Sequence, residues 1–419
     1  MRIYTFVLAG LLIFATSCSS SETKKVVDKE TVERIHQTLK SFVDSNRVAG
    51  ASALIYEDGK EVYFGAFGHA DRKEDIEMSR ESIAVIFSMT KPITGTALMQ
   101  QYEQGKFQLD DPLSDYLPEF GDVKVFEGMD DEGDPILVEP KRPLTVRDIT
   151  RHTSGFANDG NHLYIGRLLQ DAEPLNRENT LKEFAEKQAS LPLEFHPGEE
   201  WYYGPSVDVQ ARLVEVLSGE TYQDYVRENV LDPLGMDETR YFVPEEDRDR
   251  MTSLFQRNQE GELEQIPDIA GHSMYTQKWS LTPGGWGLTS TLDDYMTFTQ
   301  MLVNEGSLNG VQILKPETVK LMATNQLSEE VTERLWLPSK GQVGFGIDFA
   351  VRVAPPQSAE ENMGTVGEFF WDGAASTLFW VDPVNELTAV LFVQVFPFAG
   401  TIHKDFRDAV YGPYQPAEN

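Results

Sequence analysis

The chain has 419 residues, of which 40% are hydrophobic and 25% are charged, and this composition is typical of a globular protein with a large core. Its formal net charge of −32 argues against a protein that binds nucleic acid phosphates, so we expect no nucleic-acid partner. We interpret the charge as a solvated acidic surface. The length is sufficient for two intertwined subdomains.

The N-terminus, MRIYTFVLAGLLIFATSCSS, has one basic residue, Arg2, before an apolar run that ends in small residues. This pattern is typical of a secretory signal, and the run is too short to span a membrane comfortably. The single cysteine, Cys18, follows Ala-Thr-Ser, and the segment resembles a bacterial lipoprotein signal, although Ala15 stands where such signals more often have leucine. Simple secretion with an incidental Cys18 is the alternative.

We therefore expect a lipoprotein-type signal peptide over residues 1–18 and a polar tether over 19–30. The protein would be exported as a periplasmic or outer-membrane lipoprotein of a bacterium, with an N-terminal lipid on Cys18 as its contact with the membrane. A lipidated Cys18 leaves no cysteine for disulfides or for a cysteine-based metal site.

The first predicted elements are a helix and a hairpin. Apolar residues recur at helical spacing over 31–48, and two β-rich runs over 51–68 flank Asp58-Gly59, a strong hairpin signal. A second helix is predicted from Ser88 to Gln104, before Gly105. Because proline is tolerated only in the first turn of a helix, Pro92 places Ser88 at or very near the helix start.

Residues 121–143 are rich in glycine, proline and acidic residues and indicate an exposed excursion, and helical patterns dominate 144–235. Another hairpin is predicted over 376–396, where Asp-Pro-Val-Asn-Glu joins two apolar runs. Sheet material therefore lies at both ends of the chain. The predicted fold is α/β (α+β), with an antiparallel sheet flanked by helices and a mostly helical region inserted.

Ser88 and Lys91 form an S-x-x-K pair in the stretch FSMTKPITG. Residues three apart share a helix face, and the positive end of a helix favours an alkoxide or oxyanion nearby. A lysine held neutral can accept the proton of an adjacent serine, so the pair fits a nucleophile with its base. S-x-x-K also occurs by chance, and Ser88 as a helix cap with Lys91 at the surface is the alternative.

The surrounding segment, 87–120, resembles the serine β-lactamase and penicillin-binding-protein superfamily, in particular its class C-like branch with family VIII carboxylesterases and D-aminopeptidase-like hydrolases. Further segments resemble the family in the same order along about residues 30–415: 144–156, 197–219, 230–239, 284–298 and 369–383. The resemblance implies a single β-lactamase-like domain over 31–415. Its α/β part would comprise about 31–104 and 281–415, and its helical part about 105–280.

Carried over by position, the resemblance implies that Ser88 is the acyl-accepting nucleophile and that Lys91 shares or takes its proton. Tyr203 matches the tyrosine that activates the serine and protonates the leaving group, and Tyr202 is its chief rival; the downstream Asp208 favours Tyr203. The backbone N–H groups of Ser88 and Ala374 match the oxyanion hole.

Two departures from the family pattern bear on the substrate. Gly204-Pro205 follows Tyr203 where many members have Tyr-x-Asn, so the amide that contacts substrate amides is missing. Trp371-Asp372-Gly373 stands where many members have Lys-Thr-Gly, and this substrate-binding segment resembles the Trp-x-Gly of esterase-like members. If Asp372 faces the site, it repels substrate carboxylates and shifts activity to alkaline pH; alternatively, it points away along its strand.

The resulting prediction is a serine hydrolase for a small-molecule ester or amide, most plausibly a carboxylesterase on small or medium acyl esters. A β-lactamase or D-Ala carboxypeptidase-like hydrolase and a non-catalytic binding protein are the alternatives. We expect no cofactor and no metal, because no histidine or acidic cluster has ligand spacing. His152 in RHTSG is predicted to be a loop histidine with structural hydrogen bonds, since Ser154 lacks a nucleophile-elbow context.

Overall fold

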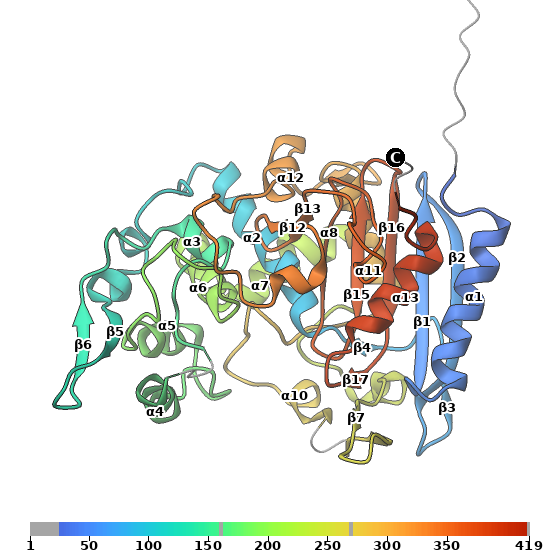
Figure 1. Ribbon diagram of the computed structural model, residues 1–419, viewed down its shortest axis with the longest axis horizontal. Coiled ribbons are helices and arrows are strands. Elements are labelled where there is room, and N and C mark those ends of the chain that lie inside the picture. Colours follow the sequence, from blue (N-terminus) through green and yellow to red (C-terminus); the bar gives the residue numbers. More distant parts are fainter. Residues whose placement is uncertain (1–24, 159–161, 268–270, 417–419) are drawn as a thin grey trace, which may run out of the picture.

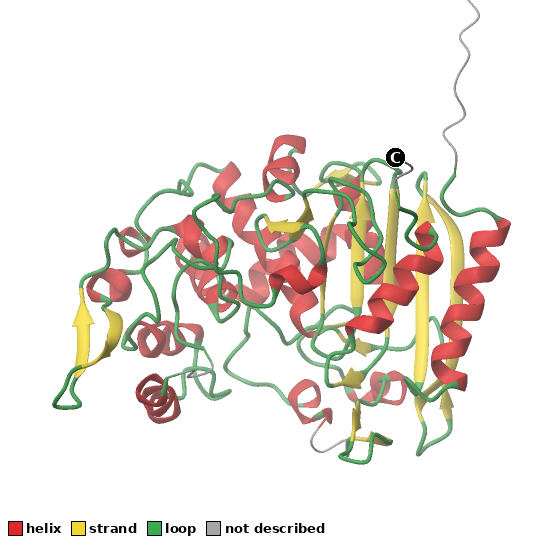
Figure 2. Cartoon of the chain, viewed as in Figure 1, coloured by secondary structure: helices red, strands yellow, loops and turns green. Residues whose placement is uncertain are grey.

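The computed structural model describes residues 25–158, 162–267 and 271–416. The large sheet lies at one end of the molecule with helices packed on it, and the other end is mostly helical apart from one strand pair, as Figure 1 and Figure 2 show. The predicted signal peptide, Cys18 and most of the predicted tether lie outside the described residues. The tether is predicted to reach residue 30, but the first helix already begins at Lys29, and the backbone of Val26 donates to Glu57 of the sheet at 2.6 Å.

The central sheet has eight strands in the order β12-β13-β14-β15-β16-β1-β2-β3, and neighbouring strands are antiparallel. The predicted fold class is therefore confirmed. The pair of β1 and β16 joins the two ends of the chain at the middle of the sheet. The strands are β1 (Gly50–Glu57), β2 (Lys60–Asp71), β3 (Ile76–Glu77), β12 (Val343–Phe345), β13 (Ala350–Arg352), β14 (Phe369–Asp372), β15 (Leu378–Asp382) and β16 (Leu387–Phe392).

Both predicted hairpins are present. Asp58 and Gly59 have φ angles of 52° and 67°, the left-handed values that a two-residue hairpin turn requires, and Glu57 pairs with Lys60 across the turn. The pair β15–β16 forms the late hairpin, and all its strand residues are buried. A continuous apolar run is expected of strands that are covered on both faces.

Helices cover both faces of the sheet. On one face, α1 (Lys29–Asp44) packs against α13 (Gly400–Tyr411), and on the other face α11 (Leu292–Val303) contacts β16, β15 and β1. α13 is fixed to the sheet by a fully buried ion cluster, in which Arg352 and Arg407 both donate to the Glu368 carboxylate, at 2.9 and 2.8 Å. Ion pairing of this kind is what makes a buried carboxylate tolerable.

The helical part packs against α2 (Thr90–Glu103), mainly through α6 (Ser206–Ser218). Its residues 121–143, predicted to be an exposed excursion, contain an antiparallel hairpin whose Met129, Ile136 and Leu137 are exposed. The elements of this part are β5 (Val125–Met129), β6 (Pro135–Val138), α3 (Val146–Thr150), α4 (Leu163–Ala172), α5 (Leu181–Ala189), α7 (Tyr222–Val226), α8 (Asp232–Leu234), β7 (Phe255–Arg257), β8 (Leu263–Gln265) and α10 (Ser273–Thr276).

A short strand pair carries the chain from the helical part back to the sheet. β9 (Thr289–Ser290) pairs with β4 (Ala84–Val85), so residues just before Ser88 lie beside residues just after Gly285. The remaining elements are β10 (Ser307–Leu308), β11 (Val311–Gln312), α12 (Pro316–Met322) and β17 (Val395–Phe396). Over the three described ranges, no helix has the length and apolar character needed to cross a bilayer.

Candidate active site

Ser88 lies at the start of a helix, as Pro92 predicts. It is the middle residue of a 3₁₀ turn, Phe87–Met89, that leads directly into α2, and Pro92 is the third residue of α2. Phe87 has a φ of 45°, an uncommon left-handed value for a bulky residue, and its ring packs edge-on against Phe396 at 5.5 Å. This sharp turn leaves Ser88 half-buried at the N-terminal end of α2.

Lys91 is buried beside Ser88. Its side chain is only 4% exposed, and its Nζ lies 3.2 Å from Ser88 Oγ and 2.6 Å from the carbonyl oxygen of Gly285. The alternative of Lys91 at the surface is therefore not what the structure shows. Both hydrogen-bond acceptors are uncharged, so the amine is held by neutral oxygens within reach of the serine proton.

The Gly285 peptide is itself held in place by a buried carboxylate. Its N–H donates to Asp208 Oδ1 at 2.9 Å, so Asp208 of α6 orients the carbonyl that binds Lys91. Burial raises the pKa of Asp208 to about 6, and the nearby Lys91 charge opposes this shift. A methyl group on Gly285 would lie 2.9 Å from Asp208 Oδ2 and 3.2 Å from Lys91 Nζ, so only glycine fits between the two groups.

Tyr203, rather than Tyr202, is brought to Lys91. The Nζ of Lys91 lies 4.6 Å from the centre of the Tyr203 ring, whereas the Tyr202 ring packs edge-on against Phe195 at 6.1 Å. Tyr203 lies in the loop before α6, and its carbonyl accepts a hydrogen bond from the Asn158 side chain at 3.0 Å. The structure thus brings Ser88, Lys91 and Tyr203 together.

An aromatic cluster surrounds Tyr203. Trp371 of β14 donates from its indole Nε1 to the Tyr203 hydroxyl at 3.2 Å. Because an indole N–H is only a donor, the Tyr203 oxygen accepts this bond, and the bond would stabilise negative charge on it. We define the aromatic cluster as Tyr203 with the rings around it, whose centres lie 4.8 to 6.1 Å away: His152, Trp336, Trp371 and Trp201.

His152 does not have the structural hydrogen bonds that we expected. It is fully buried, and neither ring nitrogen has a hydrogen-bond partner among the described residues. Burial, together with the adjacent Lys91 charge, holds the pKa of His152 well below its usual range, so the ring is neutral at physiological pH. His152 therefore acts as a packing ring beside Tyr203, which removes the basis for a Ser-His-Asp arrangement with Ser154.

Asp372 points away from the serine. Side chains alternate along a strand, and Trp371 faces Tyr203 while the Asp372 carboxylate forms an ion pair with the buried Lys340. The Nδ1 of His403 in α13 lies 3.8 Å from the same carboxylate. This placement contradicts the expectation that Asp372 contacts the substrate, because its charge is compensated on the α13 side of β14.

The backbone predicted to form the oxyanion hole is placed next to Ser88. Gly373 follows β14, and a side chain on it would lie 2.6 Å from the carbonyl oxygen of Ile86, just before the 3₁₀ turn. Glycine at 373 therefore allows the end of β14 to approach the start of the serine turn. The next residue, Ala374, is exposed at this junction.

Sequence reasoning missed Lys340, Trp336 and Asn158. Lys340 ends the 3₁₀ turn Leu337–Lys340, and only a tertiary contact reveals its pairing with Asp372. Trp336 directly precedes this turn. Its only sequence signal was that it is a tryptophan in a loop, which did not identify it as part of the site. Asn158 lies near the TSG segment, but its contact with the Tyr203 carbonyl depends on the fold.

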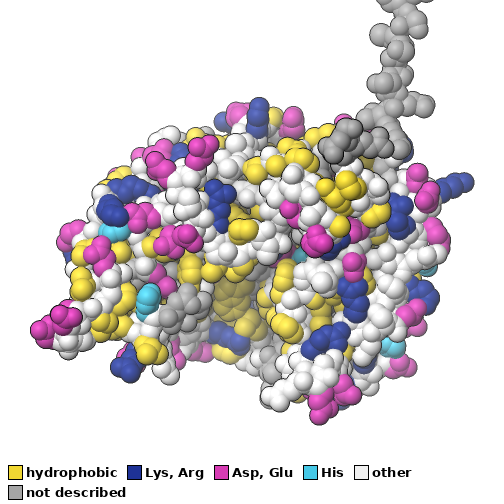
Figure 3. Space-filling view, in the orientation of Figure 1, with side chains coloured by type: hydrophobic (Ala, Val, Ile, Leu, Met, Phe, Trp, Pro, Cys, Tyr) yellow, Lys and Arg dark blue, Asp and Glu magenta, His cyan; other side chains and the backbone are white. Residues whose placement is uncertain are grey.

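Figure 3 shows the molecule hollowed between its two parts, with hydrophobic side chains at the floor of the hollow. In the described ranges, no group of three or more histidine, cysteine or acidic side chains is placed to hold a metal ion. The chemistry that the site offers is therefore that of a serine, an amine, a phenol and backbone N–H groups.

Comparisons with known proteins find a family and relatives that match most of the chain. The family profile described as Beta-lactamase matches residues 35–411. Protein Rv1367c of Mycobacterium tuberculosis is 29% identical over 86% of this chain and 89% of its own length. Lovastatin esterase of Penicillium rubens is 28% identical over 90% of this chain and 98% of its own length.

Among solved structures, EstCE1, described as a hydrolase with promiscuous acyltransferase activity, superposes with a TM-score of 0.76 and 25% identity, over 93% of this chain and all of that one. Unliganded simvastatin synthase from Aspergillus terreus superposes with a TM-score of 0.78 over 92% of this chain and 98% of its own, and its 23% identity supports the fold alone.

Proposed function

The chain belongs to the beta-lactamase family and is a serine hydrolase, and on this premise we propose that it is a carboxylesterase that acts through an acyl-enzyme on Ser88. The observation that carries the proposal is the convergence of Ser88, Lys91 and Tyr203, with the aromatic cluster on the Tyr203 side. The proposed substrates are esters with small or medium acyl groups.

In the proposed reaction, Ser88 Oγ attacks the ester carbonyl while Lys91, as a neutral amine 3.2 Å away, accepts the hydroxyl proton. The carbonyl oxygen becomes an oxyanion, which the N–H groups of Ser88 and Ala374 would stabilise. When the C–O bond to the alcohol breaks, Tyr203 gives its proton to the leaving oxygen. Lys91 then returns the serine proton to Tyr203, and water releases the acid from the acyl-enzyme.

The preference for esters rests on Trp371. In relatives with Lys-Thr-Gly, a lysine at this position can bind the carboxylate of a lactam or peptide, whereas here an indole donates to Tyr203. The only cation near Trp371 among the described residues is Lys340, 5.0 Å from its ring, and it is already paired with Asp372. Trp371 itself is fully buried, but Trp336 of the aromatic cluster is 38% exposed and Tyr203 is half-buried, and an apolar substrate group packs well against such rings.

Transfer of the acyl group to an alcohol is a second candidate. A relative that is 28% identical is the acyltransferase calJ of Penicillium decumbens. An apolar site favours an alcohol over water as acceptor because it binds the alcohol's carbon chain. Adding 1-butanol to the ester assay tests this: butyl ester formed in competition with the free acid supports transfer, and free acid alone argues against it.

The function is tested by assaying p-nitrophenyl butyrate and nitrocefin side by side with wild type and Ser88→Ala. We expect ester turnover that is lost in Ser88→Ala and no nitrocefin turnover. The matched control is Ser154→Ala, which removes the rival hydroxyl that bonds Ser206 at 2.9 Å, and it should retain ester turnover. Nitrocefin turnover would support the β-lactamase alternative, and activity in Ser88→Ala would place the chemistry elsewhere.

A fluorophosphonate probe separates an enzyme from a protein that only keeps the fold. We expect covalent labelling of Ser88, located by mass spectrometry of the modified peptide. Absence of labelling in wild type, together with no ester turnover, would support the non-catalytic binding protein.

We also propose that the chain is exported and anchored by a lipid on Cys18, on the basis of its N-terminal sequence. Expression in a bacterium with radiolabelled palmitate tests this. Label in wild type that is lost in Cys18→Ser supports the anchor, and cleavage without label supports simple secretion.

A further inference from the structure

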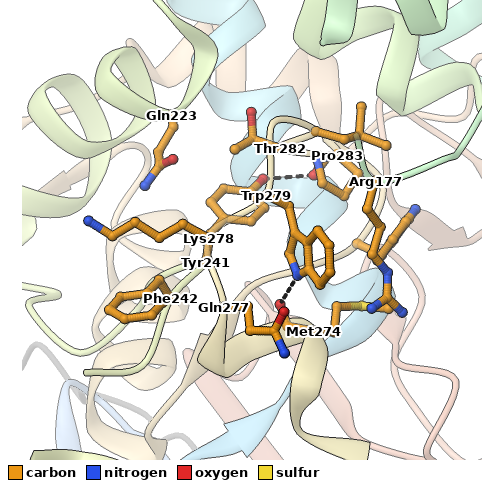
Figure 4. A pocket seen from close by; sticks show the side chains of 13 residues that line it. Arg177, Gln223, Tyr241, Phe242, Met274, Gln277, Lys278, Trp279, Thr282 and Pro283 are labelled. Carbon is orange, nitrogen blue, oxygen red and sulfur yellow. Dashed lines mark hydrogen bonds between the residues drawn. The ribbon is translucent and has the colours of Figure 1, made fainter. Parts of the chain in front are cut away.

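A pocket of about 200 Å³ lies in the helical part, between the end of α10 and the segment that leads to β9. Figure 4 shows its side chains. The walls combine large apolar groups with two cations, and the residues that matter here are Phe242, Trp279, Trp286, Arg177 and Lys278. The volume suits a short chain of carbon atoms with a polar end.

One wall of this pocket is formed by the chain segment that also contacts Lys91. Pro283, Trp286 and Gly287 line the pocket, and Gly285 between them binds Lys91 through its carbonyl at 2.6 Å. The hydroxyl of Tyr241, also a lining residue, donates to the carbonyl of Pro283 at 2.7 Å and fixes this wall, as the dashed line in Figure 4 shows. The pocket and the contact with Lys91 therefore share the segment 283–287, while Ser88 and Lys91 are not among the lining residues.

The charge in the pocket has the opposite sign to that of the protein. The chain has 68 acidic and 36 basic residues, yet the lining includes Arg177 and Lys278 and no acidic residue. Neither cation has a carboxylate within ion-pair distance among the described residues. Instead, the Arg177 guanidinium lies 5.2 Å from the Trp279 ring and the Lys278 amine 5.3 Å from the Phe242 ring.

Two cations on aromatic rings with no acidic partner are what an anion with an apolar body requires. We propose that this pocket binds the distal carboxylate of the substrate's acyl group, so that the substrates are half-esters of dicarboxylic acids. The apolar methylenes lie against Trp279 and Phe242, and the carboxylate accepts hydrogen bonds from Arg177 or Lys278. This inference rests on the proposed esterase function and names its substrate class.

The acyl group, rather than the alcohol, is assigned to this pocket because of Tyr203. Tyr203 gives its proton to the leaving alcohol, so the alcohol leaves on the side of the aromatic cluster. The segment around Gly285 binds Lys91 through the Gly285 carbonyl, and its neighbouring residues form one wall of the pocket. The proposed carboxylate site is also in a different place from that of family members with Lys-Thr-Gly. In those members a lysine at the position of Trp371 would bind the carboxylate.

The first test measures binding without turnover. Ser88→Ala is titrated with 4-phenylbutyrate and with its neutral isostere 4-phenylbutanamide, by isothermal titration calorimetry at low salt. We expect the carboxylate to bind about tenfold more tightly than the amide, and this difference to disappear in Ser88→Ala/Arg177→Gln/Lys278→Gln. Equal affinities for the two ligands, or no binding of either, would overturn the proposal.

The second test measures selectivity. The substrates are mono-p-nitrophenyl suberate and the p-nitrophenyl ester of suberic acid monoamide, and the readout is the ratio of their kcat/KM values. Arg177→Gln/Lys278→Gln should lower this ratio about tenfold, and 1 M salt should lower it in wild type more than in the variant. The matched control, Lys60→Gln/Lys320→Gln, removes the same charge from two exposed lysines outside the pocket and should keep the ratio.

The outcomes separate the two proposals. If neither ester is hydrolysed, the esterase function fails, and the calorimetric result alone decides the anion site. If both esters are hydrolysed through Ser88 but the ratio is the same in wild type, variant and control, the esterase function stands and the carboxylate pocket is overturned.

Discussion

Lys91 and Lys340 are both buried lysines next to an aromatic ring, yet their surroundings differ. Lys91 is 4% exposed and Lys340 is 6% exposed, and their Nζ atoms lie 4.6 Å from the Tyr203 ring and 5.0 Å from the Trp371 ring. Lys91 bonds the neutral oxygens of Ser88 and Gly285, whereas Lys340 bonds the Asp372 carboxylate. The two amines therefore differ in the charge of their hydrogen-bond partners, which are neutral oxygens for Lys91 and a carboxylate for Lys340.

The difference is what we expect if Lys91 is the reactive lysine and Lys340 a structural one. The buried carboxylate of Asp208 accepts a hydrogen bond from the N–H of Gly285, and the carbonyl of the same residue binds Lys91. Lys340 and Asp372 form an ion pair on one face of β14, and Trp371 of the same strand contacts Tyr203 on the other face. Changing each lysine should therefore affect different measured properties.

The largest effect is expected for Lys91→Met, which keeps the length of the side chain and removes the amine. We expect kcat/KM for p-nitrophenyl butyrate to fall by about 10³-fold or more, because the proton acceptor of Ser88 is lost. Its free energy of unfolding should fall by no more than about 2 kcal/mol, since the change removes two hydrogen bonds to neutral oxygens and a cation–π contact with Tyr203 but no ion pair. A variant that unfolds but remains active when folded would contradict the assignment.

Lys340→Met should show the opposite pattern. It leaves the buried Asp372 carboxylate without a partner, so we expect the free energy of unfolding in urea to fall by about 3 kcal/mol or more. The double variant Lys340→Met/Asp372→Asn should recover much of this loss. An Asp372→Asn variant with an altered basic limb of the pH–rate profile would instead support the alternative in which Asp372 faces the substrate.

Gly285→Ala tests the link between Asp208 and Lys91. The added methyl would lie 2.9 Å from Asp208 Oδ2 and 3.2 Å from Lys91 Nζ, which displaces the amine from Ser88. We expect kcat to fall by about 10-fold to 100-fold, a size typical of small misplacements of a catalytic group. The control is Gly121→Ala, whose methyl would meet nothing closer than Ser114 at 3.7 Å. Equal kcat values in Gly285→Ala and Gly121→Ala would contradict the proposal that Gly285 connects Asp208 to Lys91.

The smallest effect is the pH dependence of stability from Asp208. Burial raises its pKa from 3.8 to about 6, so its contribution to stability is complete below pH 3.8 and is lost as the pH rises through about 6. Asp208→Asn should therefore gain stability relative to wild type, on the order of 2 kcal/mol, between pH 4 and pH 7.5 in urea unfolding.

Asp294 provides the control for this prediction. Burial also raises its pKa to about 6, but its carboxylate bonds Thr239 and the Glu238 backbone rather than the site. Asp294→Asn should show the same trend in stability without a change in kcat. If the difference in free energy of unfolding between wild type and Asp208→Asn does not change across this pH range, the raised pKa of Asp208 is refuted.

Local signals in the sequence predicted the parts of the fold that local physics determines. Asp58-Gly59 indicated the first hairpin because a tight turn needs two left-handed residues, and Pro92 fixed the helix start at Ser88. The resemblance to the beta-lactamase family, now confirmed by the family match over 35–411, supplied the order of the motifs. The roles of Ser88, Lys91 and Tyr203 in catalysis remain predictions, although the structure places them together.

What could not be predicted depends on distant contacts. The partner of Asp372 is 32 positions away in the sequence, and no local pattern marks Lys340 as buried. His152 was expected to be a loop histidine with structural hydrogen bonds, yet its ring is buried among aromatic side chains, and neither ring nitrogen has a partner among the described residues. The β5–β6 hairpin was missed because its strands are short and exposed.

The pairing of β1 with β16 also constrains when the molecule can fold. The sheet joins a strand made early in synthesis to one made near the end, so its centre is completed only after nearly the whole chain is available. Such non-local pairing slows folding, because a long loop must close before the contacts form. The nascent chain therefore stays open with its serine exposed to solvent, and the assembled site appears late, when β14 to β16 dock beside α2.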